Sequence, residues 1–339
     1  MKILMDEKIL QSLLFSHTQI CPAKLRESYA DKYTEEVNKN LDELKINKLP
    51  LCKGIETHVD ELKKDGITFL GSILSDSQIN DLLSKLADKN IYDGHVWRHG
   101  SRKPSTITNL KKNGILQASY ALNDVIDIPN LLETANNEKV LSIAQEYLGC
   151  LPTIYSMNLM WNFQSPQGTK GVAQNFHREW DSMRFCALFV YLTDSDSSIG
   201  THQYIKQTHK PNKFEALIKK HNNNSSLLDF FCKKNPITED VFYDTSQGYG
   251  WWHCEDVFKD LIVAVNKPKG FAFLADPFGL QRGVPPITSD QLIFCSRYGI
   301  YNNGFVNDVS PNQNFEITLK NKLPIDNKSY NYLNRVFLR

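Results

Sequence analysis

The sequence lacks the cysteine pattern of a disulfide framework or a structural zinc site. Its seven cysteines are odd in number, widely spaced and include no Cys-x-x-Cys pair. Closely spaced, paired cysteines are typical of disulfide-stapled secreted domains and of zinc ribbons. We therefore expect reduced thiols and a cytoplasmic protein. Cys186 and Cys295 lie inside apolar runs, which favours small core residues over a redox role.

An excess of charge and a long hydrophobic run are also missing. The formal net charge is +1, which gives no electrostatic basis for binding nucleic acid. No apolar run approaches the roughly 18–20 residues of a membrane span, and acidic residues interrupt the N-terminus where a signal peptide has its apolar stretch. We predict a small-molecule substrate as the partner, without nucleic acid or a membrane span. The sequence does not indicate an oligomeric state.

Composition divides the 339 residues into three regions. Residues 1–60 predict a polar-faced helical extension without chemistry of its own. Residues 61–305 predict the main domain, in which residues 65–150 supply helical support and residues 210–258 form a lid or insertion. Residues 306–339 predict a C-terminal tail that packs on this domain.

Two helices of the support region carry recognisable end signals. Ser75 to Gln78 has the composition of a capping box, and apolar residues then follow with the spacing of an amphipathic helix. A second helix is expected from about Asn137 to Leu148, with Gly149 in the C-terminal cap position. Between the two helices, residues 91–125 predict a long loop region with one hairpin.

From residue 153 onward the chain favours β-structure, because strand-like runs alternate with turns rich in Gly, Asp, Ser and Pro. The run Phe185–Leu192 is apolar on both faces, as expected for a strand buried between two layers. These patterns predict a mainly β fold with flanking helices. The expected strands are Thr153–Phe163, Val172–His177, Phe185–Leu192, Thr201–Ile205, Leu261–Val265, Phe271–Ala275 and Leu292–Tyr301.

The most informative motif is the segment His177-Arg178-Glu179-Trp180-Asp181. On an extended strand residues i and i+2 face the same side, so His177 and Glu179 can face one cavity, with Asp181 as a fallback carboxylate. An imidazole and a carboxylate are two thirds of the 2-His-1-carboxylate triad that holds non-haem Fe(II). The third ligand should come from far downstream, where the sequence has Gln281 and not histidine.

The order of the motifs resembles the phytanoyl-CoA dioxygenase family over roughly residues 62–305. The motifs that carry the resemblance are the Asp65-Gly66 strand, the capped helix, the His-x-Glu segment, the apolar strand, the run from Tyr204 to Lys210 and the distal Gly279-Leu280-Gln281-Arg282-Gly283. The resemblance implies a double-stranded β-helix, that is, a cupin-like jelly roll. It also implies one Fe(II), 2-oxoglutarate as co-substrate, and hydroxylation of an unactivated C–H bond.

Carried over position by position, the resemblance implies that His177 and Glu179 are metal ligands and catalytic residues. Gln281 stands at the position of the family's second histidine, and Gln291 at that of its 2-oxoglutarate arginine. An amide offers a metal only a neutral oxygen, and it cannot form a charge-assisted pair with a carboxylate. The alternative groups are Arg297 and Arg282 for the co-substrate and His253 for the metal.

The sequence favours an enzyme but leaves three functions open. The first is an Fe(II)/2-oxoglutarate-dependent oxygenase that hydroxylates a small metabolite or a glycan or lipid precursor. The second is a catalytically degenerate jelly roll that binds a ligand or a partner in the same cavity. The third is a redox-neutral, cupin-like isomerase or epimerase that uses His177 and Glu179 as an acid/base pair.

Overall fold

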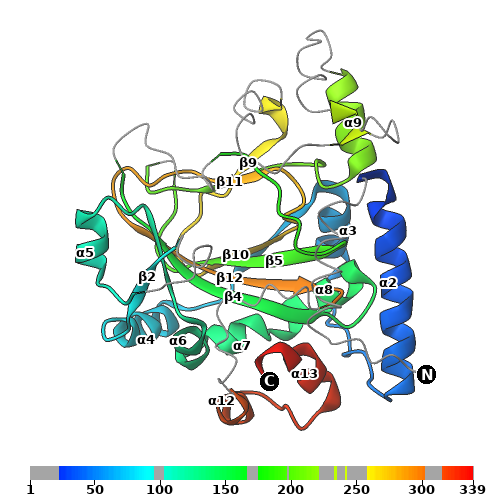
Figure 1. The fold of residues 1–339 in the computed structure, drawn as a ribbon, viewed down its shortest axis with the longest axis horizontal. Helices are drawn as coiled ribbons and strands as arrows, with labels where there is room; N and C mark the ends of the chain where they lie inside the picture. The colour runs from blue at the N-terminus through cyan, green and yellow to red at the C-terminus, as the bar shows by residue number, and fades with distance from the viewer. Residues whose placement is uncertain are drawn as a thin grey trace.

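Two β-sheets face each other in the computed structural model, and helices cover the outer face of the larger sheet (Figure 1). The structure describes residues 23–94, 103–165, 175–196, 198–220, 233–234, 241–242, 258–301 and 315–338.

All strand pairings in the described part of the chain are antiparallel. The larger sheet has the order β1 (Ile67–Ser72), β10 (Phe271–Ala275), β5 (Phe185–Tyr191), β12 (Gln291–Gly299), β4 (Thr153–Asn162), β3 (Gln117–Tyr120) and β2 (Ile91–Asp93). The smaller sheet has the order β11 (Gln281–Gly283), β6 (His202–Ile205) and β9 (Ile262–Ala264). A separate ribbon pairs β7 (Lys233–Lys234) with β8 (Val241–Phe242).

The strand order is that of a jelly roll. His177 forms an isolated antiparallel bridge with Gln281 and so extends the smaller sheet beyond β11. From β4 onward the chain visits the larger sheet, the His177 bridge, β5, then β6 and β9, then β10, β11 and β12. Within the larger sheet the order is β4-β12-β5-β10, and in the smaller sheet it is His177-β11-β6-β9. This is the eight-stranded double-stranded β-helix, and the predicted fold class is confirmed.

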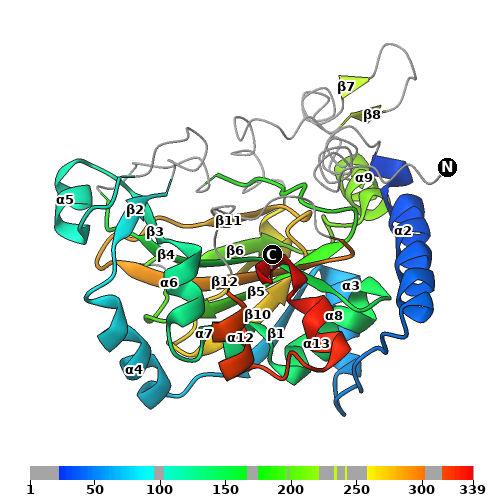
Figure 2. The same ribbon diagram turned by 60° about the horizontal axis from the view of Figure 1, so that its bottom comes forward.

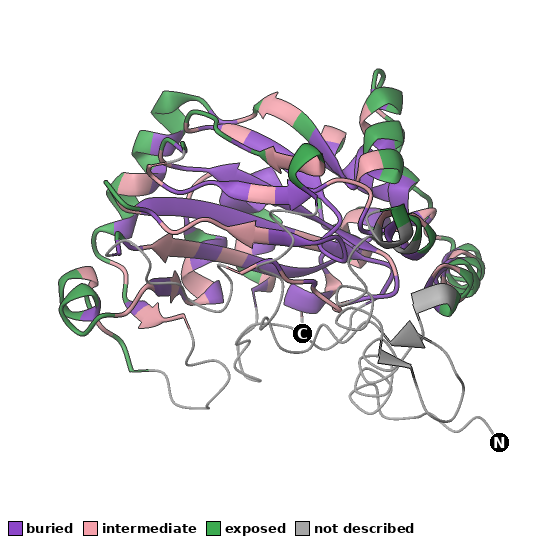
Figure 3. Ribbon diagram, turned by 90° about the horizontal axis from the view of Figure 1, so that it is seen from above, coloured by how far each residue is buried: buried purple, intermediate pink, exposed green. Residues whose placement is uncertain are grey.

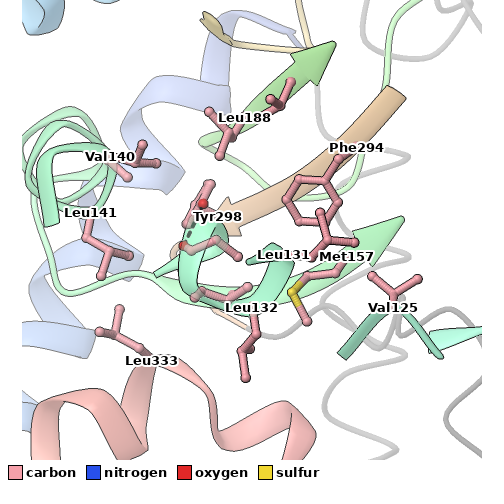
Figure 4. Packing of buried hydrophobic residues seen from close by; sticks show 14 of the residues in the cluster. Val125, Leu131, Leu132, Val140, Leu141, Met157, Leu188, Phe294, Tyr298 and Leu333 are labelled. Atoms are coloured by element: carbon pink, nitrogen blue, oxygen red, sulfur yellow. Dashed lines mark hydrogen bonds between the residues drawn. The ribbon is translucent and has the colours of Figure 1, made fainter. Parts of the chain in front are cut away.

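The central strands are buried on both faces, because side chains alternate between the two sides of a strand. Every residue of β5 is buried, as the sequence predicted for Phe185–Leu192 (Figure 3). On the outer face, Leu188 and Phe294 pack with residues of the helices, and the Tyr298 hydroxyl donates to the Ala135 carbonyl at 2.8 Å (Figure 4). Cys186 is buried on this side and Cys295 on the inner side.

Helices cover the outer face from both ends of the chain (Figure 2). At the end of the predicted extension lies α3 (Glu56–Asp65), and the support region contains α4 (Asp76–Leu86), α5 (Ile107–Lys112), α6 (Leu122–Asp127), α7 (Leu131–Ala135) and α8 (Glu138–Leu148). The C-terminal residues form α12 (Glu316–Lys322), α13 (Lys328–Leu333) and the 3-10 turn Arg335–Phe337. At one side of the sandwich lie α2 (Ala23–Glu43) and α9 (Pro211–Lys220), and the 3-10 turn Lys259–Leu261 precedes β9.

Both predicted helix-end signals are confirmed. The Ser75 hydroxyl accepts from the Gln78 backbone N–H at 3.3 Å, and the Gln78 side chain accepts from the Ser75 N–H at 3.0 Å. Gly149 ends α8 with a φ of 81°, in the left-handed region that favours glycine. The 21 residues of α2 are largely polar, and no helix within the described ranges is both apolar and long enough to cross a bilayer.

Residues 91–125 are more regular than the sequence suggested. The expected hairpin corresponds to β2 and β3, but α5 and α6 also form here, and both strands join the edge of the larger sheet. These elements have three to six residues, too few to show a period. Residues 95–102 lie outside the described residues, as do residues 172–174 of the expected Val172–His177 strand and most of the expected lid.

Candidate functional site

The His-x-Glu segment and the distal Gln281 lie side by side. His177 and Gln281 exchange backbone hydrogen bonds of 2.9 and 3.0 Å, and the Glu179 N–H donates to the Pro277 carbonyl at 2.8 Å. These bonds align the segment with the start of β11. The structure therefore brings His177, Glu179 and Gln281 together, as the spacing in the sequence led us to expect.

The Glu179 carboxylate accepts hydrogen bonds at both oxygens. Arg297 donates from Nε to Oε2 at 3.0 Å and from Nη2 to Oε1 at 3.2 Å, and Gln281 Nε2 donates to Oε1 at 3.2 Å. Burial acts to raise the pKa of Glu179, but the charge and the hydrogen bonds of Arg297 outweigh it and hold the pKa below its usual value. Glu179 is thus an ionised carboxylate in a bidentate ion pair.

A second carboxylate shares the same guanidinium. Asp181 Oδ2 lies 3.5 Å from Arg297 Nε and accepts from the Tyr155 hydroxyl at 3.1 Å. Burial and the neighbouring Glu179 charge raise the pKa of Asp181 to about 6. The side chains of Glu179, Asp181 and Arg297 are 20, 15 and 18% exposed, so water reaches this group of charges.

A β-bulge in β4 brings Tyr155 to Asp181. Arg297 pairs with Ser156 and the next residue of β12, Tyr298, pairs with Ile154, so Tyr155 has no residue opposite it. Such a bulge turns the extra residue's side chain away from the regular alternation. The structure thus places the Tyr155 hydroxyl on a site carboxylate.

Two histidines lie on either side of Gln281. His177 Nδ1 is 2.8 Å from the Asn175 carbonyl oxygen, which can only accept, so this bond requires the proton on Nδ1 and leaves Nε2 as the basic nitrogen. His202 is buried, and burial lowers the pKa of its imidazole to about 4. His202 Nε2 and Gln281 Oε1 are both buried, and neither has a hydrogen-bond partner among the described residues.

Gln291, at the position of the family's co-substrate arginine, is held in a chain of amides. Gln291 Nε2 donates to the Gly200 carbonyl at 2.8 Å, and its Oε1 accepts from Asn162 at 3.2 Å. Asn162 in turn accepts from Gln117 at 2.8 Å. Arg297 is six residues further along β12, roughly 20 Å at the rise of a strand, so it does not replace an arginine at 291.

Arg282 contacts other groups on its own side of the smaller sheet. Its Nε donates to Gln203 Oε1 at 2.9 Å, and its guanidinium lies 4.4 Å from the ring centroid of Phe176. Adjacent residues of a strand face opposite sides, so Arg282 faces away from the side that Gln281 occupies. His253, the alternative metal ligand, lies outside the described residues.

Aromatic rings fill the interior of the jelly roll next to this site. Phe189 and Phe273 stack with centroids 5.0 Å apart, and the His202 ring packs on them at 4.8 and 5.1 Å. Tyr191 packs on Phe273 at 5.9 Å. The inner core also contains Ile293 and Cys295 of β12, whose side chains lie between Gln291 and Arg297 on the same face.

The described residues do not fit an Fe(II) and 2-oxoglutarate centre. Among them, no group of three or more His, Cys, Asp or Glu side chains is arranged to hold a metal ion. Both Glu179 oxygens face N–H donors, and Gln281 directs its amide nitrogen at this carboxylate. A cationic partner for the far carboxylate of 2-oxoglutarate is also missing at Gln291, which the amide chain holds.

No protein-family model and no curated protein matches this chain. Among solved structures it is similar to the epimerase SnoN in complex with Fe3+, α-ketoglutarate and nogalamycin RO, with 10% identity over 72% of this chain and 82% of that chain and a TM-score of 0.44. It is similar to EctD from S. alaskensis with 2-oxoglutarate and 5-hydroxyectoine, with 16% identity, coverage of 72 and 75% and a TM-score of 0.42.

A third similar structure is HygX from Streptomyces hygroscopicus with nickel, 2-oxoglutarate and hygromycin B bound. Its identity is 13%, the coverage is 74% of this chain and 89% of that chain, and the TM-score is 0.44. All three structures contain 2-oxoglutarate and a second small molecule, and those of SnoN and HygX also contain a metal ion. At these identities and scores the likeness carries no argument about activity, and the fold assignment rests on the strand order.

Proposed function

We propose that this chain binds a small molecule at the polar group formed by His177, Glu179, Asp181, Gln281 and Arg297, hereafter the Glu179 cluster, and that it does so without Fe(II) or 2-oxoglutarate. The observation that carries the proposal is the Arg297 guanidinium on both oxygens of Glu179. A guanidinium and a metal ion are both cations and compete for the same lone pairs. The oxygenase activity implied by the family resemblance remains the alternative that the experiment below tests.

In the competition for the Glu179 carboxylate, the Arg297 guanidinium is favoured over a metal ion. For Glu179 to bind a metal it must leave Arg297, and breaking a buried pair costs about 3–5 kcal/mol. The side chains here are 18 and 20% exposed, so the lower end, about 3 kcal/mol, is appropriate. This corresponds to a weakening of metal affinity by roughly a hundredfold. The third donor would be a neutral amide, which adds little in return.

The Glu179 cluster has the groups that a small-molecule site needs. A guanidinium, two carboxylates and an imidazole nitrogen lie together and are partly exposed, beside the buried Tyr155 hydroxyl and an apolar wall that includes Phe189. A few converging polar groups next to apolar side chains are typical of ligand sites. The ion pair holds the carboxylates and the guanidinium in place before a ligand arrives, which lowers the cost of ordering them.

An anaerobic titration with Fe(II) separates this proposal from the oxygenase. Binding is followed by calorimetry, and succinate formation from 2-oxoglutarate is measured in parallel, for the wild type and for His177→Ala. We expect no stoichiometric Fe(II) binding at micromolar concentration and no succinate above that of the His177→Ala protein. Stoichiometric Fe(II) binding that His177→Ala removes, together with succinate formation, would establish the oxygenase instead.

Ligand binding is tested separately with a panel of metabolites. Thermal shift with the wild type identifies compounds that stabilise the fold, because a ligand that binds only the native state raises its stability. Each compound is then titrated against Asp181→Asn and against Asp290→Asn, a surface ion-pair control. Weakened binding in Asp181→Asn alone supports the cluster as the ligand site, and equal binding to both variants places the ligand elsewhere.

A second candidate, metal-independent acid/base catalysis, is favoured by the unequal carboxylates. Arg297 keeps Glu179 ionised, whereas the pKa of Asp181 is raised to about 6. Two carboxyl groups that differ in this way can act as proton donor and acceptor. In D2O with a chelator present, such an enzyme incorporates deuterium into one metabolite of an extract, and Asp181→Asn does not. No deuterium incorporation at pH 6–7 would remove this candidate.

A further inference from the structure

A buried arginine of helix α2 contacts the backbone at Ser182, the residue that follows Asp181 of the Glu179 cluster. Arg26 of the largely polar helix α2 is only 1% exposed. Its Nη2 donates to the Ser182 carbonyl, next to Asp181. Its guanidinium lies 4.0 Å from the Phe278 ring centroid and 5.5 Å from that of Trp180. Charged side chains are this deeply buried only where specific partners compensate them.

The side chains of residues 177–182 alternate between the cluster and the helices. His177, Glu179 and Asp181 enter the cluster, as the contacts above show. Between them, Arg178 donates to the carbonyls of Thr208 and Phe278, and Trp180 packs edge-on against the Phe278 ring at 5.0 Å. A shift of the backbone at Trp180 or Ser182 therefore moves the two carboxylates.

Phe278 connects two arginines that hold this segment. The Arg26 guanidinium lies 4.0 Å from its ring centroid and the Arg178 guanidinium 4.8 Å. Arg178 also lies over Phe214 of α9, at 4.5 Å. Cations over aromatic faces are attracted by the ring quadrupole, most strongly where both groups are removed from water. The segment is thus held from α2 on one side and from α9 on the other.

We propose that Arg26 is a positioning residue for the Glu179 cluster, and that the N-terminal helix is therefore part of the ligand site. The assignment of the cluster as a ligand site rests on the proposed function. The placement of the carboxylates by Arg26 does not, and it can be measured in the free protein. Arg26 acts through Trp180, Phe278 and the Ser182 carbonyl and does not itself touch the Arg297–Glu179 pair.

Other contacts also hold α2 against the rest of the protein, and one of them supplies a matched control for substitutions of Arg26. Arg184 pairs with Glu27 at 3.1 Å and with Asp31 at 2.6 Å, both on α2, and Thr34 donates to the Leu148 carbonyl at 3.2 Å. Arg184→Met therefore weakens the docking of α2 without removing a contact to Trp180 or Phe278. Arg26→Met removes those contacts and the bond to Ser182, while it keeps most of the side-chain volume.

The experiment follows the Arg297 Nε–H signal by NMR in the full chain, because this proton lies in the bond to Glu179. The signal is assigned by its loss in Arg297→Lys. In Arg26→Met we expect its exchange with water to accelerate about tenfold, a loss of about 1.4 kcal/mol in the protection of the pair. Arg26→Lys should recover part of the effect, and Arg184→Met should leave the exchange rate at the wild-type value even where it lowers the melting temperature.

An unchanged Arg297 signal in a folded Arg26→Met protein would overturn the proposal, as would equal acceleration in Arg184→Met. If Arg26→Met does not fold, Arg26→Lys, which keeps the charge but loses the planar fork of donors, is compared with Arg184→Met in the same way. The measurement needs no ligand, so its outcome is independent of whether the cluster proves to be the ligand site. The metal titration and the metabolite panel test the proposed function itself.

Discussion

Arg297 and Glu179 form a bidentate ion pair between the end of β12 and the segment that follows the His177 bridge, with N–O distances of 3.0 and 3.2 Å. They are 118 residues apart in the chain. The pair joins the two sheets of the jelly roll at the place where the resemblance to phytanoyl-CoA dioxygenases implies a metal. The charge that compensates the carboxylate is therefore part of the protein.

The Arg297–Glu179 pair should contribute to stability. We expect Arg297→Met to lower the free energy of unfolding by about 2–3 kcal/mol, since it leaves Glu179 and Asp181 close together without their shared cation. Urea denaturation measures the change. Lys111→Met, which breaks an exposed pair with Asp290, should cost no more than about 1 kcal/mol. Equal losses of unfolding free energy in the two variants would show that the Arg297–Glu179 pair stabilises the fold no more than the exposed pair does.

Gln281→His should raise the affinity of the site for a divalent metal ion above that of the wild type. An imidazole at 281 supplies a basic nitrogen opposite His177, and we expect Ni(II) or Co(II) affinity to rise about 10–100-fold, in the range known for changes near a metal site. Calorimetry measures the gain, and His177→Ala in the same background should abolish it. A gain that survives His177→Ala would mean that residue 281 does not face the site.

The raised pKa of Asp181 makes this carboxyl a cost to stability at neutral pH. Its pKa is about 6 in the folded chain, above its ordinary value, so the folded state binds the proton more tightly than the unfolded state does. The stability that this proton contributes is therefore lost as pH rises from about 4 to 6. Glu179, with a lowered pKa, contributes in the opposite sense, and its contribution is lost as pH falls below its ordinary value of 4.5. Asp181→Asn should therefore gain stability relative to the wild type between pH 5 and 7, measured by urea denaturation at several pH values. A constant difference across this range would contradict the shift.

Gly279 should tolerate no side chain, because Tyr204 lies against it. A Cβ at Gly279 would lie 1.8 Å from the Tyr204 hydroxyl, which itself donates to the Asp276 carbonyl at 2.9 Å. We expect Gly279→Ala to cost about 1–3 kcal/mol through overpacking. Gly283→Ala, four residues on, has no atom within 4 Å of its Cβ and serves as the control. Thermal unfolding of the two variants compares them, and equal melting temperatures would contradict the close approach.

The strands near the site were predicted closely from the sequence because they are long and their pattern is clear. Thr153–Phe163 and Phe185–Leu192 differ by one residue from β4 and β5. The approach of Gln281 to His177 followed from the order of the motifs. The partner of Arg297 did not, because strand parity gives only the face of a residue. Which residue of the His177 segment lies opposite Arg297 depends on how the two sheets pack on each other.

No pattern in the sequence indicated that α2 contacts the residues next to the Glu179 cluster. Arg26 is one basic residue in a helix rich in Lys and Glu, and nothing in its neighbours distinguishes it from the exposed Lys32 or Lys39. Its burial is a consequence of where α2 docks, next to Trp180 and Phe278. The short helices α5 and α6 were missed for a different reason, since six residues do not establish a period.

The most direct test of the central claim is the Arg297 Nε–H signal before and after addition of one equivalent of Zn(II), a diamagnetic probe, together with 2-oxoglutarate. If the guanidinium occupies the Glu179 carboxylate as we infer, the signal keeps its position and its slow exchange. Loss or a large shift of the signal, together with a shift of the His177 ring resonances, would show that Glu179 leaves Arg297 for the metal, and the metal-independent account would be wrong.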